Sequence, residues 1–474
     1  MENCLIILFG VSGDLAKKRI LPALYDLINA PDVKNIKILG VARRKLSNSN
    51  IIQNSRIYLR NLDAKNIKKF KQNFHYFQLQ FNDSNQFKDL TSYIKNIEKK
   101  YSINNKIFYL SISPEYYEPI LMNFKNLDLE NSKGYNRIII EKPFGYDLNS
   151  AIKINNLLKK FFNEKDIFRI DHYLGKDIVQ DVVTLRFTNR IIKPIWKNEH
   201  INHIQIISTE SVGIESRGEY YDKFGALKDF VQSHVIQLLA LTTLHEPEKL
   251  TEEFIRNHKI NILKNIEIKE VVFGQYKGYR NELQVNKDSK TETLAAIKLF
   301  INLPNWKNIP IYILHGKCLK DKLTTIYVEF NQSECLMLGN KCDYYPNYLN
   351  LQIYPHEGFY LRLNTRNPIN DEIVPVIMSY CHECIFGHWT ANAYNKLICE
   401  VIKGNQLLFI RSDEVIEQWK IIEKINRKKS KLFFYDKGKI PSQVKNFIEK
   451  DGYSWHLKID KPNIVVQDGE LKNK

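Results

Sequence analysis

Residues 4–19 read CLIILFGVSGDLAKKR, and this stretch decides the fold of the first part of the chain. A short apolar run at 4–9 leads into a turn with two glycines and then into a helical pattern. Such a run is typical of a strand buried on both faces. The glycines let a pyrophosphate approach the backbone at the helix N-terminus. The spacing is G-x-x-G rather than G-x-G-x-x-G, so a tight strand-to-helix turn without a ligand also fits.

Strands and helices alternate up to about residue 171. Further short apolar runs lie at 36–42, 74–81, 107–112, 137–141 and 167–170. Amphipathic stretches such as 15–30 and 87–101 separate them. The alternation predicts a doubly wound parallel sheet, so we expect residues 1–171 to form an α/β Rossmann-like dinucleotide-binding domain.

After about residue 180 the apolar runs are longer or alternate in polarity. They lie at 203–210, 293–301, 324–330, 349–353 and 359–364, and helical patterns occur at 224–243 and 391–403. Alternating runs are typical of antiparallel strands with one covered face. We therefore expect residues 172–474 to form an α+β domain with a large mostly antiparallel sheet that binds substrate and forms a dimer. A chain of 474 residues agrees with two domains.

Composition and charge limit the classes of partner that this chain is expected to bind. No apolar run reaches the roughly 18 residues of a membrane span, and the N-terminus lacks the basic region of a signal peptide. The net charge is +17, but the lysines are spread along the chain. The dense basic runs at 65–71 and 426–431 are typical of solvated faces, and no nucleic-acid-binding motif occurs. We expect a cytoplasmic protein that binds neither membrane nor nucleic acid.

The seven cysteines are an odd number scattered over a long chain. This usage predicts free thiols in a reducing compartment. Cys381, Cys384 and His388 resemble a metal-ligand cluster, but zinc usually needs a fourth ligand and no second C-x-x-C occurs. We therefore predict no metal site.

Two strand ends in the first domain carry cationic side chains. The second predicted strand ends in GVARRK, with Arg43 and Arg44 and no acid. A guanidinium grips a 2′-phosphate that a carboxylate would repel, so NADP is favoured over NAD, although solvated arginines also fit. The fifth strand ends in RIIIEKPFGYD, where Lys142 lies at the edge of the sheet that collects ligands. Pro143 restricts Lys142 and suits a cis bond, and a plain loop is the alternative.

The stretch RIDHYLGKDIVQ, residues 169–180, is dense in polar groups. If it is helical, His172 and Lys176 share a face and Asp171 points elsewhere, although Asp171 as a helix cap also fits. Further on, Glu210 ends an apolar strand, and Asp229 and His234 lie on an otherwise apolar helical stretch. A core histidine with a satisfied ring is the alternative reading of that stretch. The segment HGKCLKDK supplies Lys317 and Lys322 after another strand.

These motifs together resemble one family. GVSGDLAKKR, EKPFGYD, RIDHYLGKD, the 210–234 segment and GKCLKDK occur in the order found in glucose-6-phosphate dehydrogenases of the bacterial type, and PIWKNEHI and AYNKLICEVIKGNQLLFIRSDEV are also similar. The resemblance covers about residues 4–425. It implies oxidation of C1 of β-D-glucose 6-phosphate to 6-phosphoglucono-δ-lactone with hydride transfer to NADP. Ser233 and Tyr354 depart from the family, where Asn and Gln are usual.

The resemblance also implies residue roles. His234 is the general base, oriented by Asp171. The implied substrate-binding residues are His172, Tyr173, Lys176, Glu210, Asp229, Lys317, Lys322 and Lys142. The implied cofactor-binding residues are Gly10, Ser12, Gly13, Asp14, Leu15, Arg43 and Lys142. By analogy, the exposed sheet of the second domain is expected to form a homodimer or homotetramer. An oxidoreductase for an unphosphorylated sugar is less favoured because of the cationic cluster, and a non-enzymatic basic protein has only the charge in its favour.

Overall fold

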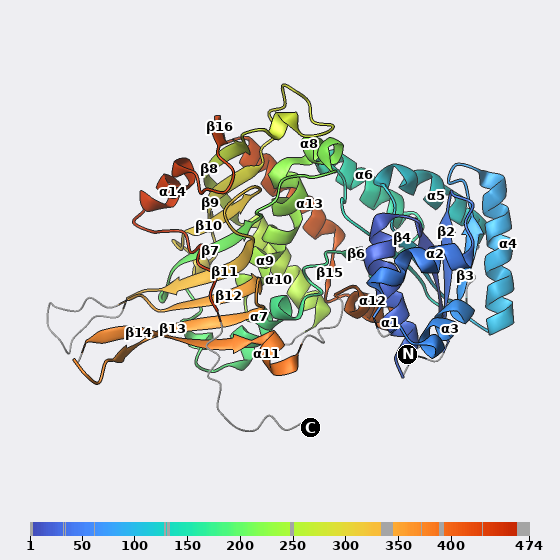
Figure 1. The fold of residues 1–474 in the computed structure, drawn as a ribbon, viewed down its shortest axis with the longest axis horizontal. Helices are drawn as coiled ribbons and strands as arrows, with labels where there is room; N and C mark the ends of the chain where they lie inside the picture. The colour runs from blue at the N-terminus through green and yellow to red at the C-terminus, as the bar shows by residue number, and fades with distance from the viewer. Residues whose placement is uncertain are drawn as a thin grey trace. The chain divides into compact units, whose positions relative to one another are not determined.

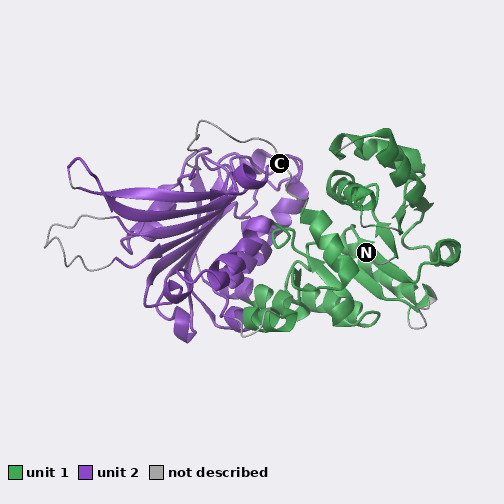
Figure 2. Ribbon diagram, turned by 90° about the horizontal axis from the view of Figure 1, so that it is seen from below, with its two compact units in different colours: residues 1–176, 247–260, 391–420 green, residues 177–246, 261–390, 421–474 purple. Residues whose placement is uncertain are grey.

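The computed structural model describes residues 3–31, 33, 35–60, 62–127, 129, 133–246, 251–332, 345–370, 372–387, 393–428 and 430–461. The chain divides into two compact units, each discontinuous in sequence (Figure 2). Unit 1 comprises Met1–Lys176, Pro247–Ile260 and Ala391–Lys420, and unit 2 comprises Asp177–Glu246, Asn261–Thr390 and Ile421–Lys474. Two segments well beyond residue 171 therefore return to unit 1, which a linear division of the chain does not include.

Unit 1 is built on a seven-stranded sheet in the order β15-β6-β5-β4-β1-β2-β3 (Figure 1). Six strands are parallel: β1 Cys4–Phe9, β2 Ile36–Ala42, β3 Phe74–Gln78, β4 Asn105–Leu110, β5 Asn136–Ile140 and β6 Ile167–Ile170. The two-residue β15, Phe409–Ile410, pairs antiparallel with β6. Because the chain order reverses between β1 and β4, the carboxyl ends of these strands form the topological switch point where ligands bind. The predicted Rossmann-like sheet is confirmed.

Helices cover both faces of this sheet. The side chains of Cys4, Ile6 and Leu8 share a core with α1 and α12. Phe9 points the other way, against the rings of Phe81 and Phe124 at centroid distances of 6.3 and 6.1 Å. Burial on both faces explains why the parallel strands are continuous apolar runs. The helices of unit 1 are α1 Leu21–Asn29, α2 Asn48–Ser55, α3 Ala64–Asn73, α4 Ser84–Tyr101, α5 Tyr117–Asn123, α6 Leu148–Lys159 and α12 Ala393–Lys403. Two more, α10 Glu252–Lys264 and α13 Ser412–Asn426, begin in unit 1.

Unit 2 is built on a nine-stranded sheet in the order β14-β13-β12-β11-β7-β10-β9-β8-β16 (Figure 1). The strands are β7 Ile201–Thr209, β8 Ile266–Tyr276, β9 Leu294–Ile301, β10 Ile311–Gly316, β11 Leu323–Phe330, β12 Tyr348–Tyr354, β13 Gly358–Arg366, β14 Ile373–Cys381 and β16 Leu432–Tyr435. Only β7 with β10 and β8 with β16 are parallel among the described pairs. The prediction of a large mostly antiparallel sheet is confirmed.

The two faces of this sheet carry different elements. The helices α7 Asp177–Thr188 and α9 Ile236–Thr242 cover one face, and a π-helix, η8 Leu227–Val235, joins α9 to the preceding helix, α8 Gly218–Ala226. On the other face lie α14 Ser442–Glu449 and the segment after it, in which the Ser454 carbonyl accepts a hydrogen bond from Gln205 at 2.8 Å. No helix in the described part of the chain is long and apolar enough to cross a membrane.

The cysteines differ from the expectation of free thiols. Cys381 and Cys384 form a disulfide where β14 runs into α11, His382–Phe386, because the turn brings their Cα atoms to 5.2 Å. Cys4, Cys318 and Cys399 take part in no disulfide. His388, the third member of the metal-like motif, lies outside the described residues.

Candidate active site

The glycine turn of unit 1 lies at the topological switch point. Gly10, at the carboxyl end of β1, has a φ of +81°, and a Cβ atom there would lie 2.2 Å from the carbonyl oxygen of Ser111, just after β4. Only glycine allows this approach of the two strand ends. The Gly13 N–H donates to the Gly10 carbonyl at 2.9 Å, which closes the turn. Gly13 and Asp14 are exposed, and Ser12 and Leu15 are half-buried, so a ligand can reach the turn.

Arg43 is held at the end of β2. Its Nη1 donates to the Tyr116 hydroxyl at 2.9 Å, and its guanidinium lies 4.9 Å from the centroid of that ring. Its carbonyl accepts hydrogen bonds from Gln78 and Gln80, both at 3.1 Å. The side chain is exposed, and a guanidinium carries five N–H groups, so donors remain for an anion. Tyr116 was not identified from the sequence, because it comes from a different segment.

A buried carboxyl precedes Lys142. Glu141 accepts a hydrogen bond from the Tyr109 hydroxyl at 2.6 Å, and its carbonyl accepts one from Tyr117 at 3.3 Å. Burial raises the pKa of Glu141 to about 7, although the bond from Tyr109 opposes this rise. The Lys142–Pro143 peptide is cis, as the sequence suggested. Lys142 is half-buried, and the carbonyl of the residue before it is held by the Tyr117 hydroxyl.

The stretch RIDHYLGK is not helical, so that part of the hypothesis is wrong. Residues 171–176 form two turns, closed by Leu174 N–H to Asp171 carbonyl at 3.0 Å and Lys176 N–H to Tyr173 carbonyl at 3.1 Å. The helix α7 begins only at Asp177. The Asp171 carboxylate accepts from the Tyr173 N–H at 3.0 Å. Asp171 thus caps a turn, as short acidic side chains do, rather than a helix.

The turns nevertheless bring the predicted phosphate-binding residues together. The Lys176 ammonium lies 5.3 Å from the centroid of the Tyr173 ring. The His172 ring meets the Tyr173 ring edge-on at 5.1 Å and stacks parallel to Tyr394 at 6.4 Å. All three predicted residues are half-buried. They form a compact group in which Lys176 and the His172 ring offer nitrogen donors, which suits a phosphate dianion.

In unit 2, an ion pair joins the ends of two parallel strands. Glu210 follows β7 and Lys317 follows β10, and Lys317 Nζ donates to Glu210 Oε2 at 2.7 Å. Lys317 is fully buried, whereas the Glu210 side chain is 23% exposed. Burial alone would raise the pKa of Glu210, but the charge and hydrogen bond of Lys317 outweigh it and hold the pKa below its usual value. Glu210 is therefore an ionised hydrogen-bond acceptor near neutral pH.

His315 adds a residue that the sequence did not single out. Its Nδ1 lies 2.9 Å from the Ser208 carbonyl, and its ring stacks on Phe230 of η8 at 4.3 Å with 6° between the planes. Burial lowers the pKa of His315 to about 4, so it is neutral near pH 7. A neutral ring with Nδ1 as donor satisfies the carbonyl and packs flat against η8.

The π-helix η8 carries Asp229 and His234. Asp229 accepts from the Tyr220 hydroxyl at 3.3 Å, and the buried His234 ring lies 5.0 Å from Phe230, edge to face. In an α-helix, residues five apart differ by about 140° beyond one full turn. The i→i+5 bonds of a π-helix instead bring such residues to about the same side, and π-bulges are frequent at functional sites. The predicted continuous helix over 224–243 hides this change of pitch.

Lys322 immediately precedes β11, whose first residue, Leu323, pairs with Thr209, the residue before Glu210. Lys322 is exposed, and its ammonium lies 4.2 Å from the centroid of the Tyr354 ring. Tyr354 is one of the two departures from the family pattern, where Gln is usual. The aromatic ring at this position contacts Lys322, a predicted substrate-binding residue. Asp171 belongs to unit 1 and His234 to unit 2, so their pairing stays a prediction.

Family models match both parts of the chain. The model described as "Glucose-6-phosphate dehydrogenase, NAD binding domain" matches residues 7–181, and the one described as "Glucose-6-phosphate dehydrogenase, C-terminal domain" matches residues 183–456. Glucose-6-phosphate 1-dehydrogenase of Bacillus subtilis (strain 168) is 35% identical over 96% of this chain and 98% of its own length. The enzyme of Chlamydia pneumoniae is 36% identical over 95% and 96%.

Solved structures agree with these matches. One is described as glucose-6-phosphate dehydrogenase in complex with its substrate glucose-6-phosphate, and it has a TM-score of 0.88 and 30% identity over 96% of this chain and 98% of its own. The enzyme from Mycobacterium avium has a TM-score of 0.85 and 28% identity over 97% and 99%. The resemblance inferred from the motifs is confirmed over both units, and the chain belongs to the glucose-6-phosphate dehydrogenase family of oxidoreductases.

Proposed function

We propose that this protein oxidises C1 of β-D-glucose 6-phosphate to 6-phosphoglucono-δ-lactone, the first step of the oxidative pentose phosphate pathway, with NADP as the hydride acceptor. The observation that carries the proposal is the polar group of unit 2. There, ionised Glu210 with Lys317, and neutral His315, lie on the side of the sheet that packs against the π-helix of Asp229 and His234. A relative solved with glucose-6-phosphate supports the substrate.

Each residue has a role that its environment suits. His234 takes the proton of the C1 hydroxyl, because an imidazole titrates near working pH. Asp171 hydrogen-bonds this base and stabilises the imidazolium that forms. Glu210 and Asp229 accept hydrogen bonds from sugar hydroxyls. The remaining substrate contacts are assigned to His172, Tyr173 and Lys176 at the phosphate, with Lys142, Lys317 and Lys322 around the sugar phosphate.

The residues at the switch point fit a dinucleotide. The turn of Gly10, Ser12, Gly13, Asp14 and Leu15 would hold the pyrophosphate through its backbone, since the glycine at position 10 keeps the two strand ends close. Arg43 would hold the 2′-phosphate of NADP, because its guanidinium is exposed and held at Tyr116. Lys142 would contact cofactor and substrate. When bound, the nicotinamide supplies the acceptor for the hydride of C1.

The test is the absorbance of reduced nicotinamide with purified protein, NADP and glucose 6-phosphate. A His234→Asn variant should retain binding of the sugar phosphate and lose roughly 10²–10⁴-fold in kcat, the usual contribution of a general base. A matched His200→Asn variant, at an exposed histidine of the same unit, should retain wild-type kcat. Near-normal kcat in His234→Asn would reject the assigned base. Equal kcat/KM for glucose and glucose 6-phosphate would reject the phosphate site.

We also propose that the protein is cytoplasmic and assembles as a homodimer or homotetramer. The described edge strand β14 supports assembly, because Val376 and Met378 on it are 39% and 60% exposed. Apolar side chains on an unpaired edge are typical of an interaction surface.

A further inference from the structure

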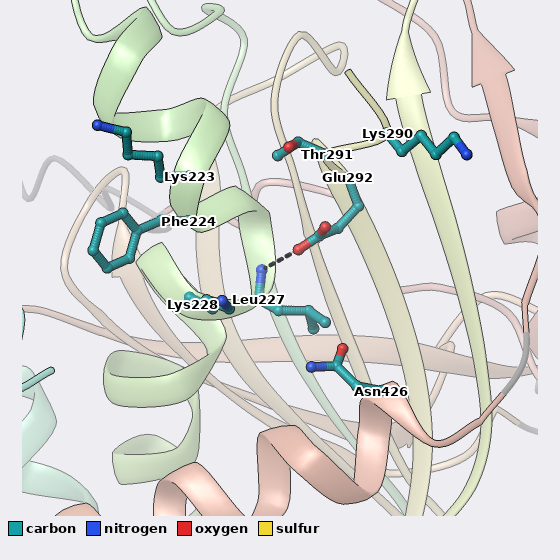
Figure 3. Close-up of a pocket in the computed structure, with 8 residues that line it drawn as sticks. All are labelled: Lys223, Phe224, Leu227, Lys228, Lys290, Thr291, Glu292 and Asn426. Atoms are coloured by element: carbon teal, nitrogen blue, oxygen red, sulfur yellow. Dashed lines mark hydrogen bonds between the residues drawn. The ribbon is translucent and has the colours of Figure 1, made fainter. Parts of the chain in front are cut away.

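A cavity of about 280 Å³ lies in unit 2 where α8 meets η8. Its wall includes Glu292, which comes from the segment just before β9. Figure 3 shows the Glu292 carboxylate pointing toward the helix, whereas the ammonium groups of Lys223 and Lys290 point away from it to opposite sides. The lysines thus do not converge on a common ligand, and the feature to explain is the carboxylate.

Glu292 contacts the junction of α8 and η8 twice. Its Oε1 accepts from the Leu227 N–H at 3.0 Å, and its carbonyl accepts from the Ala226 N–H at 2.9 Å. The first N–H groups of a helix have no partner within the helix, so an external acceptor satisfies them. One residue from a distant segment therefore fixes the beginning of η8.

The break between α8 and η8 is shaped around this carboxylate. Gly225 has a φ of +64° and a ψ of −177°, a conformation that is essentially limited to glycine. A Cβ atom at position 225 would lie 2.5 Å from Glu292 Oε1. The position of the Glu292 carboxylate therefore requires a glycine at position 225, where the helical backbone is interrupted.

A carboxylate is an unfavourable choice for a helix cap with only a structural role, because removing its charge from water costs free energy. Burial raises the pKa of Glu292 to about 7, against the hydrogen bond from Leu227 and the charge of Lys228. Burial raises the pKa values of Tyr221 and Tyr279, and the charge of Glu292 adds to the rise. A serine or threonine would cap a helix without a partly buried charge. Glu292 is half-buried, and carboxyls with perturbed pKa values cluster at functional sites.

We propose that Glu292 is a positioning residue for the reaction. By accepting the Leu227 N–H it sets the start, and hence the rotation, of the π-helix on which Asp229 and His234 lie two and seven residues further on. The inference rests on the proposed function, because its consequence is the placement of the sugar-hydroxyl acceptor and of the base.

The test compares Glu292→Ala, Glu292→Gln and Glu292→Asp with the wild type. We expect kcat with glucose 6-phosphate and NADP to fall about 10- to 100-fold in Glu292→Ala, because misplacement of catalytic groups by about 1 Å costs on that order. Glu292→Gln should stay within about threefold of wild type, because its amide oxygen still accepts from Leu227. Glu292→Asp has a shorter side chain that misses the Leu227 N–H, so its kcat should fall about 10-fold. This variant provides the test if Glu292→Ala fails to fold. Rates are normalised to the folded fraction measured by circular dichroism.

Two further readouts separate positioning from stability. The Kd for NADP, which binds unit 1, should stay within about twofold of the wild-type value in all three variants. The control Lys290→Ala changes another residue of the same cavity wall, and its kcat should also stay within about twofold of the wild-type value. Wild-type kcat in the folded fraction of Glu292→Ala or Glu292→Asp would overturn the role of Glu292, and so would a Glu292→Gln variant as slow as Glu292→Ala. A wild-type protein without turnover would instead reject the proposed function itself.

Discussion

At the scale of single residues, the proposed preference for NADP over NAD rests on Arg43. We expect Arg43→Ala to raise KM for NADP about 10- to 100-fold, because a hydrogen bond to a charged group contributes about 1.5–3 kcal/mol. KM for NAD should stay within about threefold, since NAD lacks the 2′-phosphate. Initial rates with both cofactors check this. Arg44→Ala, at the exposed neighbour, is the control and should leave both values unchanged. An equal rise for both cofactors would contradict the assignment.

Single residues also show how far sequence reasoning reaches. Gly10 could be identified, because its role depends on a local strand–turn–helix order. Tyr116, Glu141 and His315 could not, because each acts through partners from distant segments: Arg43, Tyr109 and Phe230. Side-chain contacts of this kind are set by tertiary packing and leave no periodic signal in the chain.

At the scale of elements, the Glu210–Lys317 pair follows from strand register. Thr209 pairs with Gly316 where β7 and β10 run parallel, so the next two residues leave the sheet together. With its pKa held below the usual value, Glu210 adds stability above its unfolded-state pKa and loses it as the pH falls through the lower folded-state pKa.

Lys317→Met should reverse that dependence. Without the cation, burial raises the pKa of Glu210, so the variant should lose stability as the pH rises through the raised folded-state pKa. Removing one partner of such a pair costs about 2–5 kcal/mol. Urea unfolding at pH 5 and pH 8 should therefore show a larger loss at pH 8. Lys320→Met, at an exposed lysine of the same loop, is the control. An equal loss at both pH values would contradict the role of the ion pair.

Elements differ in how well their patterns predict them. The limits of β1, β2 and β6 agree with the sequence, because strands buried on both faces are continuous apolar runs. The strand β14 was missed, since its sequence IVPVIMSYC holds a proline and it lies at a sheet edge. The π-helix was read as part of one α-helix, because a longer turn changes the hydrogen bonds without changing the apolar composition.

At the scale of the whole molecule, the division into units is discontinuous. Residues of β15 and α12 return to unit 1 from beyond residue 390, and β15 contributes only two residues to the sheet. A two-residue strand leaves no recognisable hydrophobic pattern in the sequence. The local sequence pattern therefore predicts only a single boundary near residue 171. Both fold classes could still be assigned, because unit 1 contains several short continuous apolar runs and unit 2 several runs that alternate in polarity.

At the same scale, the exposed edge strand β14 of the sheet in unit 2 is the proposed surface for assembly. If β14 forms the contact between copies, Met378→Glu should place a charge in that contact and yield a single chain of 56.0 kDa. The wild type should sediment at twice or four times that mass in analytical ultracentrifugation. Ile57→Glu, which changes an 80% exposed apolar residue of unit 1, should leave the mass unchanged. A wild type at the mass of one chain would contradict assembly, and a Met378→Glu variant that stays assembled would contradict a contact through apolar packing at β14. Because an edge strand offers unpaired backbone groups as well as side chains, the variant separates a contact through apolar packing from one through strand pairing alone.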